Sequence, residues 1–257
     1  MLEMRPAKQP AKRLREEPTL EKRAAAVGGA SAHLRVEHVR QYHKWDCGLA
    51  CVIMVLRANG QRRTRQELIS MAGTNSIWTV DLAYILRSCG ATFTFLTVME
   101  GVRESYETEA FYRDDLDADR RRVEKLFRGA AAAGINVKVS SLSSEELAES
   151  IFAGQAAIVL TDRRLLRPRR PPIGTRSGGG VASDGSVSFE ALQDGSTFTG
   201  HYILLCGFDR ATRQFDVRDP ASALAHYTVP VDQLDRARTA FGTDEDVLLV
   251  SVPGDGT

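Results

Sequence analysis

The segment that most constrains this fold runs from Cys47 to Asn59. Its apolar residues follow one another without a polar break: Leu49, Ala50, Cys51, Val52, Ile53, Met54, Val55 and Leu56. A helix that is apolar on every side belongs inside a core, because a surface helix keeps one polar face. Asn59-Gly60 predicts the end of this helix. Other elements must therefore enclose it, and 257 residues, 43% of them hydrophobic, suffice for such a core.

The order of the remaining elements predicts an α+β fold. Helices are expected at residues 64–72, 79–89, 117–133, 143–153 and 231–239. Strands are expected at 34–39, 91–99, 135–139, 155–161, 201–208, 214–218, 225–229 and 246–252. Strands dominate after Gly200, so we predict an N-terminal helical half and a C-terminal antiparallel sheet.

Two segments stand apart from this pattern. Residues 1–33 are rich in Lys, Arg, Glu, Pro and Ala, and they carry too little apolar surface to offset the entropy of ordering. We expect a disordered basic tail there and a folded domain over 34–253. Residues 162–199 combine Arg, Pro and Gly, which is typical of a surface insertion. Its arginines could contact an anionic ligand, although a solvated loop is the simpler interpretation.

The charge balance and the cysteines exclude several classes of protein. With 34 basic and 33 acidic residues the formal net charge is +1, which predicts neither nucleic-acid nor membrane-surface binding. Apolar runs are too short to cross a bilayer, and the N-terminus lacks the apolar stretch of a secretory signal. We expect a cytoplasmic protein, with the nucleus as the alternative. Its four cysteines should then be free thiols, and their spacing predicts no metal site.

Cys47 is the first candidate for chemistry, because it opens the buried helix. Backbone N–H groups and the helix dipole at such a position favour a thiolate, the nucleophilic form. Gly48 would let a substrate backbone approach, and the Gln41 amide could join the Cys47 N–H in an oxyanion hole. Asp46 can cap the helix or contact substrate, although its charge would disfavour the thiolate. A buried cysteine alone is more often a small core residue, and the other three are assigned to that class.

A base for this thiol is expected from the second half of the chain. His201 begins an apolar strand directly after Gly200, and Asp219 ends the strand predicted to pair with it. If both lie at the same end of that hairpin, Asp219 accepts a hydrogen bond from the imidazole and fixes its tautomer. Taken singly, each residue has a structural explanation. Together they predict a nucleophile, a general base and an orienting acid.

Two sets of motifs resemble known families. Gln41, Asp46-Cys47-Gly48-Leu-Ala50, Gly200-His201-Tyr-Ile and Asp219-Pro220 resemble the papain-like peptidases that remove double-glycine leaders from bacteriocins. The segments at 42–51, 76–84, 111–113, 157–160 and 242–246 resemble the guanylyl cyclase domain-containing family of plants and animals. The second resemblance spans about residues 36–252 and is poor across 162–199. Both imply a papain-like cysteine-peptidase fold.

The residues and the family name imply different reactions. The Cys-His-Asp order predicts a thiol hydrolase that cleaves a peptide or isopeptide bond of a peptide or protein substrate without a cofactor. Trp45, Ile77, Trp78 and Gly200 would line its substrate groove, unless they belong to the core. The family name implies cyclisation of GTP to cyclic GMP, with magnesium or manganese on carboxylates. No Gly-rich phosphate loop follows a strand here. A third interpretation is an inactive papain-like binding module.

Overall fold

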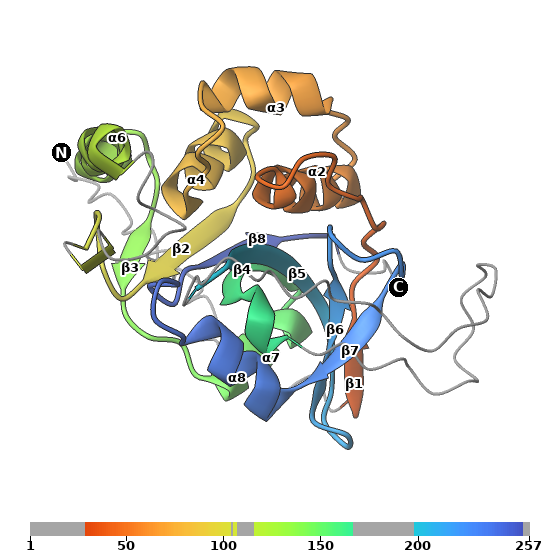
Figure 1. Cartoon of the computed structure of the whole chain (residues 1–257). Coiled ribbons are helices and arrows are strands. Elements are labelled where there is room, and N and C mark those ends of the chain that lie inside the picture. Colours follow the sequence, from red (N-terminus) through yellow and green to blue (C-terminus); the bar gives the residue numbers. More distant parts are fainter. Residues whose placement is uncertain (1–28, 104, 107–115, 167–197, 254–257) are drawn as a thin grey trace, which may run out of the picture.

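A computed structural model describes residues 29–103, 105–106, 116–166 and 198–253, which form one large sheet with helices on both faces (Figure 1). The helices are α2 (Cys47–Ala58), α3 (Arg65–Ala72), α4 (Thr79–Ser88), α6 (Leu116–Ala130), α7 (Ser144–Phe152), the 3-10 helix η2 (Arg163–Leu165) and α8 (Val231–Arg238). The strands are β1 (Ser31–His33), β2 (Phe93–Thr97), β3 (Val137–Val139), β4 (Gln155–Asp162), β5 (Gly200–Asp209), β6 (Gln214–Arg218), β7 (Tyr227–Pro230) and β8 (Val247–Ser251).

The sheet has the strand order β3-β2-β8-β4-β5-β6-β7, and β1 pairs with the far end of β5. Among the strand pairs of the described residues, β2–β3 is parallel and the others are antiparallel. This confirms the predicted α+β class, with β2, β3 and β4, which precede Gly200, also joining the sheet. Figure 1 shows α2 and α4 above the sheet and α7 and α8 below it.

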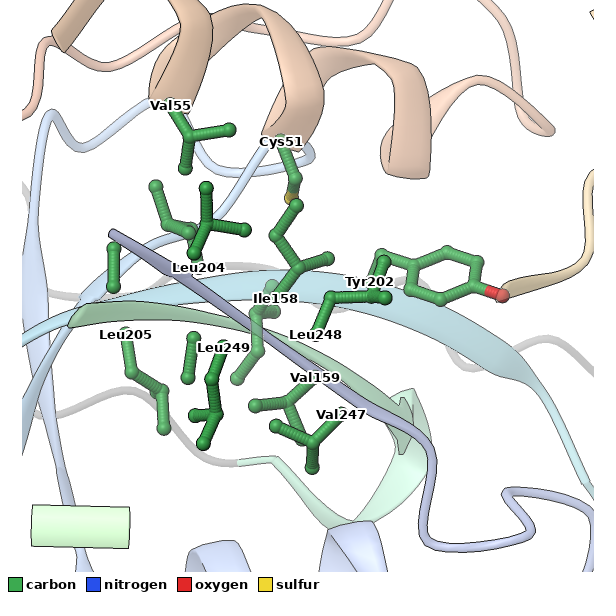
Figure 2. Close-up of a cluster of buried hydrophobic side chains, with 14 of the residues drawn as sticks. Cys51, Val55, Ile158, Val159, Tyr202, Leu204, Leu205, Val247, Leu248 and Leu249 are labelled. Atoms are coloured by element: carbon green, nitrogen blue, oxygen red, sulfur yellow. The ribbon is translucent and has the colours of Figure 1, made fainter. Parts of the chain in front are cut away.

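The apolar helix α2 lies on the centre of the sheet. Every residue of Cys47–Leu56 is buried, which confirms that the rest of the fold encloses this helix. Figure 2 shows Cys51 directed from α2 toward Leu204, Ile158 and Leu248. These three are direct cross-strand partners on β5, β4 and β8, so they form one apolar row beneath the helix. The next residue along each strand points to the opposite face.

Local capping signals explain where several helices begin. The predicted capping box at α3 is present: Thr64 N–H donates to Glu67 at 2.6 Å, and Glu67 N–H donates to the Thr64 hydroxyl at 3.2 Å. The same reciprocal pair opens α7. At α4 the cap differs from the prediction, because Trp78 precedes the helix and donates its N–H to Asp81 at 2.8 Å. Thr79 is instead the first helical residue.

The N-terminal edge also differs from the prediction. Ser31–His33, expected in the tail, form β1 against β5, while residues 34–39, expected as a strand, form no ladder. Leu34 and Val36 are buried, and one hydrogen bond joins Leu34 N–H to the Cys206 carbonyl at 2.7 Å. The alternation of apolar and polar residues in this segment therefore reflects two side chains buried in the core and not a paired strand.

The expected insertion at 162–199 begins later than predicted. Asp162 is the last residue of β4 and pairs with Gly200, and η2 follows it directly. Residues 167–197 lie outside the described residues, as do residues 1–28 of the expected tail. Within the described part, no helix is both long and apolar enough to cross a membrane.

Candidate active site

Cys47 is the first residue of α2 and lines a cavity of about 320 Å³. Its thiol interacts with the imidazole of His201, which comes from the start of β5 and is 3% exposed. The core beneath α2 holds the helix against the sheet, so the sulfur has a fixed position relative to the imidazole. The structure thus brings the expected nucleophile and base into contact.

Asp219 lies on the other side of the imidazole. Because β5 and β6 are antiparallel, the start of β5 and the residue after β6 meet at one end of the sheet. His201 Nε2 is 2.7 Å from Asp219 Oδ1, which leaves Nδ1 to face Cys47. The three side chains are each at most 5% exposed. They form a buried row drawn from α2, β5 and the end of β6.

The pKa values of His201 and Asp219 show how strongly they are paired. Burial alone would lower the pKa of His201 and raise that of Asp219, because both charged forms lose hydration. Their mutual charge and hydrogen bond outweigh burial, with Cys47 adding to the effect on His201. The pKa of His201 rises to about 9, and that of Asp219 falls to about 2. At neutral pH the imidazole is therefore held protonated beside a carboxylate.

Three further groups fix Asp219, and sequence analysis selected none of them. The Tyr227 hydroxyl donates to Oδ2 at 2.9 Å, and the Ala221 N–H donates to Oδ1 at 2.8 Å. His38 Nε2 lies 2.8 Å from the Asp219 carbonyl oxygen. The Ala221 bond is an Asx turn, which an Asp two residues earlier could have indicated. Tyr227 gave a weaker signal, namely its place in a short strand with alternating burial.

Asp46 serves the turn before α2, and its expected substrate contact stays a prediction. Its carboxylate is fully buried and accepts from the N–H groups of Tyr42 and His43, at 3.1 and 3.0 Å to Oδ1. It also pairs with Arg65 of α3 at 2.5 Å and makes no side-chain cap to α2. In this structure the Asp46 carboxylate is therefore engaged by the turn and by α3.

Gly48 is required by packing, and the expected approach of a substrate backbone there stays a prediction. The residue is buried in α2 and does not line the cavity. A Cβ at this position would lie 2.8 Å from Leu82 and 3.0 Å from Tyr202. Glycine here lets α2 fit closely between α4 and β5.

Gln41, the expected oxyanion donor, links two loops around the site. Its side-chain Nε2 donates to the His43 carbonyl at 2.8 Å, and its backbone N–H donates to the Pro220 carbonyl at 3.0 Å. Its Oε1 is buried and has no hydrogen-bond partner in the described part of the chain. Gln41 does not line the cavity, so donation to an oxyanion requires its amide to exchange the His43 carbonyl for substrate. That role stays a prediction.

The wall of the cavity contains the other residues expected to meet a substrate. Trp45, Ile77, Trp78 and Gly200 all line it. Trp45 is stacked on His43 with ring centroids 5.4 Å apart. Trp78 Nε1 donates to a carboxylate at 2.8 Å, which fixes the orientation of its indole. The apolar wall therefore presents two positioned aromatic rings beside Cys47.

The cavity also carries polar groups that sequence analysis did not select as site residues. Thr79 Oγ1 and the Tyr202 hydroxyl lie 2.8 Å apart. Asp246 is 8% exposed and interacts with the hydroxyls of Thr79 and Thr97, while its Oδ1 has no hydrogen-bond partner in the described residues. Burial raises the pKa of Asp246 well above its usual value. Asp246 belongs to the 242–246 segment that resembles the guanylyl cyclase family, and this resemblance was the sequence signal that could have identified it.

The carboxylates around the cavity are not arranged as a metal site. Asp119 pairs with Arg122 at 2.8 Å, and Asp244 pairs with Arg103 at 2.6 Å. Residues 29–103, 105–106, 116–166 and 198–253 contain no group of three or more His, Cys, Asp or Glu placed to hold a metal ion. The acidic positions 114 and 115 lie outside the described residues.

Comparison with known proteins agrees with this architecture. A family model described as guanylylate cyclase matches residues 36–250. Guanylyl cyclase 1 of Arabidopsis thaliana is 39% identical over 230 residues, which cover 87% of this chain and 78% of that relative. A solved C39-like peptidase from Bacillus anthracis aligns with a TM-score of 0.50 at 14% identity, covering 88% of this chain and 99% of that one. Xylellain, a cysteine protease from Xylella fastidiosa, aligns with a TM-score of 0.46 at 11% identity, covering 91% and 90%. The fold is papain-like, and by its sequence the chain belongs to the guanylylate cyclase family.

Proposed function

We propose that this protein is a thiol hydrolase that cleaves a peptide or isopeptide bond. The observation that carries the proposal is the buried row of Cys47, His201 and Asp219, in which the imidazole contacts the sulfur on one side and the carboxylate on the other. A purely structural histidine does not need a buried carboxylate partner and a neighbouring thiol at a cavity. The row matches the roles of nucleophile, general base and orienting acid.

The reaction follows from the placement of these groups. The Cys47 thiolate attacks the carbonyl carbon, so a C–S bond forms and the carbonyl electron pair moves onto oxygen. The His201 imidazolium then gives its proton to the leaving nitrogen while the C–N bond breaks, which releases an amine and leaves a thioester. His201 next removes a proton from water, and the water attacks the thioester. The acid product leaves, Cys47 is regenerated, and one water is consumed.

Other residues support the same two steps. Backbone N–H groups at the start of α2 have no partner within the helix and can accept the developing negative charge, with the Gln41 amide as the second expected donor. Trp45 and Trp78 offer flat apolar surfaces to a peptide segment on either side of the scissile bond. The substrate class is therefore an extended peptide or an isopeptide-linked chain end.

The family name supports a second candidate, a cyclase that converts GTP to cyclic GMP. Carboxylates do lie at the cavity, and Asp246 is the one of these without an ion-pair partner among the described residues. This reaction needs metal ions to neutralise phosphate charge. It predicts metal-dependent product that is retained in Cys47→Ala and lost in Asp246→Asn. The arginines already paired with Asp119 and Asp244 make this site a poorer fit for a metal than for thiol chemistry.

One set of assays separates these candidate functions. Wild type, Cys47→Ala and the matched control Cys89→Ala are incubated with a library of internally quenched peptides and, separately, with GTP plus magnesium or manganese. The thiol hydrolase predicts peptide cleavage that is abolished only in Cys47→Ala. Cyclic GMP that persists in Cys47→Ala supports the cyclase. If neither substrate is turned over while Cys47→Ala folds normally, the hydrolase proposal fails and a binding module is favoured.

A further inference from the structure

A second and larger cavity lies at the opposite end of α2 from Cys47. It has a volume of about 760 Å³ and is lined by the segment after β1, the end of α2 and the last residue of β6. That size is within the range of small-molecule sites in proteins. The lining includes Arg35, Arg57, Arg62 and Arg218, with Glu37 as the acidic member. The wall therefore carries a clear excess of positive charge.

Arg218 is the unusual member of this wall, because the residue is only 8% exposed. Its Nε donates to the Val36 carbonyl at 3.0 Å, and its Nη2 lies 3.5 Å from His33 Nε2. Its Nη1 has no hydrogen-bond partner in the described part of the chain. No carboxylate of the described residues lies within ion-pairing distance of this guanidinium. An arginine cannot lose its proton to relieve such a charge, so burying it without an anion is costly.

Asp216 interacts with Arg218 electrostatically, which helps to lower the Asp216 pKa, but the two side chains form no ion pair. Asp216, two residues earlier on β6, is engaged by His33 Nδ1 at 2.7 Å. The remaining three arginines are exposed and come from two different segments around the cavity. They converge with Arg218 although like charges repel. An oxyanion in the cavity would be attracted by all four charges and would offset their mutual repulsion.

We propose that this cavity binds a small ligand carrying two or more phosphate groups. Guanidinium forks match phosphate oxygens in pairs, so several arginines around one cavity favour a multiply charged oxyanion over a single carboxylate. The cavity has a volume of only about 760 Å³, and the chain has a net charge of only +1, which favours a small ligand over an extended nucleic acid. A nucleoside polyphosphate and a free polyphosphate share this chemistry. The site shares no lining residue with the Cys47 cavity and does not depend on the proposed hydrolase.

The test is calorimetric titration of the full chain with inorganic tripolyphosphate and with ATP, in EDTA, at low and physiological salt. We expect one site per chain. The double variant Arg57→Gln/Arg62→Gln, which changes exposed side chains, should weaken binding by at least about tenfold, since a charge-assisted contact contributes about 1.5–3 kcal/mol. Arg218→Met should weaken it at least as much. Arg121→Gln, an exposed arginine on α6, is the matched control and should stay within about twofold.

Each outcome decides the proposal. Tighter binding of ATP than of tripolyphosphate identifies a nucleotide ligand, and equal binding identifies the phosphate chain alone as the recognised group. If Arg218→Met does not fold, the Arg57/Arg62 double variant gives the answer. The proposal is overturned if the wild type binds neither probe, or if Arg121→Gln weakens binding as much as the cavity variants do. Cys47→Ala should bind tripolyphosphate like wild type even if it has lost all peptide cleavage.

Discussion

The two ends of α2 treat buried charge in opposite ways. At the Cys47 end the buried charges of the row and of the turn before α2 are paired: Asp219 pairs with His201, and Asp46 pairs with Arg65. At the other end, about 16 Å away at 1.5 Å per residue, Arg218 is buried beside a hydrogen-bonded backbone carbonyl but no carboxylate. The ion pairs at the Cys47 end hold their side chains in one geometry, as a catalytic site requires. An unpaired buried charge marks a position where a ligand of opposite charge can supply the missing partner.

The largest expected effect comes from breaking the paired end. His201→Ala should lower peptide cleavage by about 10⁴-fold or more, because the thiol loses its base and the leaving amine its acid. Tripolyphosphate binding at the other end of α2 should be unchanged. Steady-state kinetics and calorimetry measure both, with His226→Ala as the control histidine outside the Cys47 cavity. Equal cleavage by the two histidine variants would contradict the assignment of the base.

Removing the charge of Asp219 while keeping its shape should have a smaller effect. In Asp219→Asn the His201 ring keeps a hydrogen-bonding neighbour but loses the carboxylate that raises its pKa. We expect a rate loss of about 10²–10⁴-fold, below that of His201→Ala. The alkaline limb of the pH–rate profile should move to lower pH. An unchanged alkaline limb would show that Asp219 does not set the protonation of His201.

The same pair should make stability depend on pH in a defined window. His201 has a pKa near 9 in the folded protein, against 6.5 for an ordinary histidine. Its contribution to the free energy of unfolding is therefore complete below about pH 6.5 and is lost as the pH rises through about 9. Asp219, with a lowered pKa, contributes above about pH 3.8 and loses that contribution as the pH falls through about 2. Urea unfolding should therefore show the largest gap between wild type and Asp219→Asn from about pH 4 to 6.5. A gap that widens toward pH 9 would contradict the pairing.

The smallest expected effect is that of Tyr227→Phe. This change removes one hydrogen bond to the Asp219 carboxylate and leaves the Ala221 bond in place. A hydrogen bond to a charged group is worth about 1.5–3 kcal/mol, so we expect that loss in the free energy of unfolding and a modest fall in cleavage. Thr228→Val, on the neighbouring position of β7, is the control. A loss no larger than that of the control would show that Tyr227 does not support the row.

How much of this the sequence can predict depends on whether the signal is local. The position of Cys47 at a helix start and those of His201 and Asp219 at strand ends follow from periodicity and turn residues in the neighbouring sequence. Antiparallel pairing of adjacent strands then places His201 beside Asp219. For this reason the fold class and the three central residues can be predicted from the sequence alone.

The remaining details depend on side-chain direction, which sequence neighbours do not determine. Asp46 and Gly48 flank Cys47 in the chain. The Asp46 side chain points into the turn before α2, whereas Gly48 leaves room for Tyr202, which a Cβ at this position would meet. Tyr227 and Asp246 reach the site from later strands through the strand order of the sheet. The burial of Arg218 likewise depends on how β6 meets the segment after β1. Such contacts require the full arrangement of the sheet.

The most direct test of the paired end is the site-specific reactivity of its thiol. Wild type and His201→Ala are treated with limiting iodoacetamide at pH 6.5, and the labelling rate of each cysteine is followed by mass spectrometry. Cys89 is the internal standard, because it is 8% exposed against 5% for Cys47, so accessibility alone favours Cys89. We predict that Cys47 is alkylated roughly 100-fold faster than Cys89, as expected for a stabilised thiolate, and that His201→Ala removes the advantage. Equal rates at the two cysteines, or a Cys47 rate unaffected by His201→Ala, would contradict the central claim.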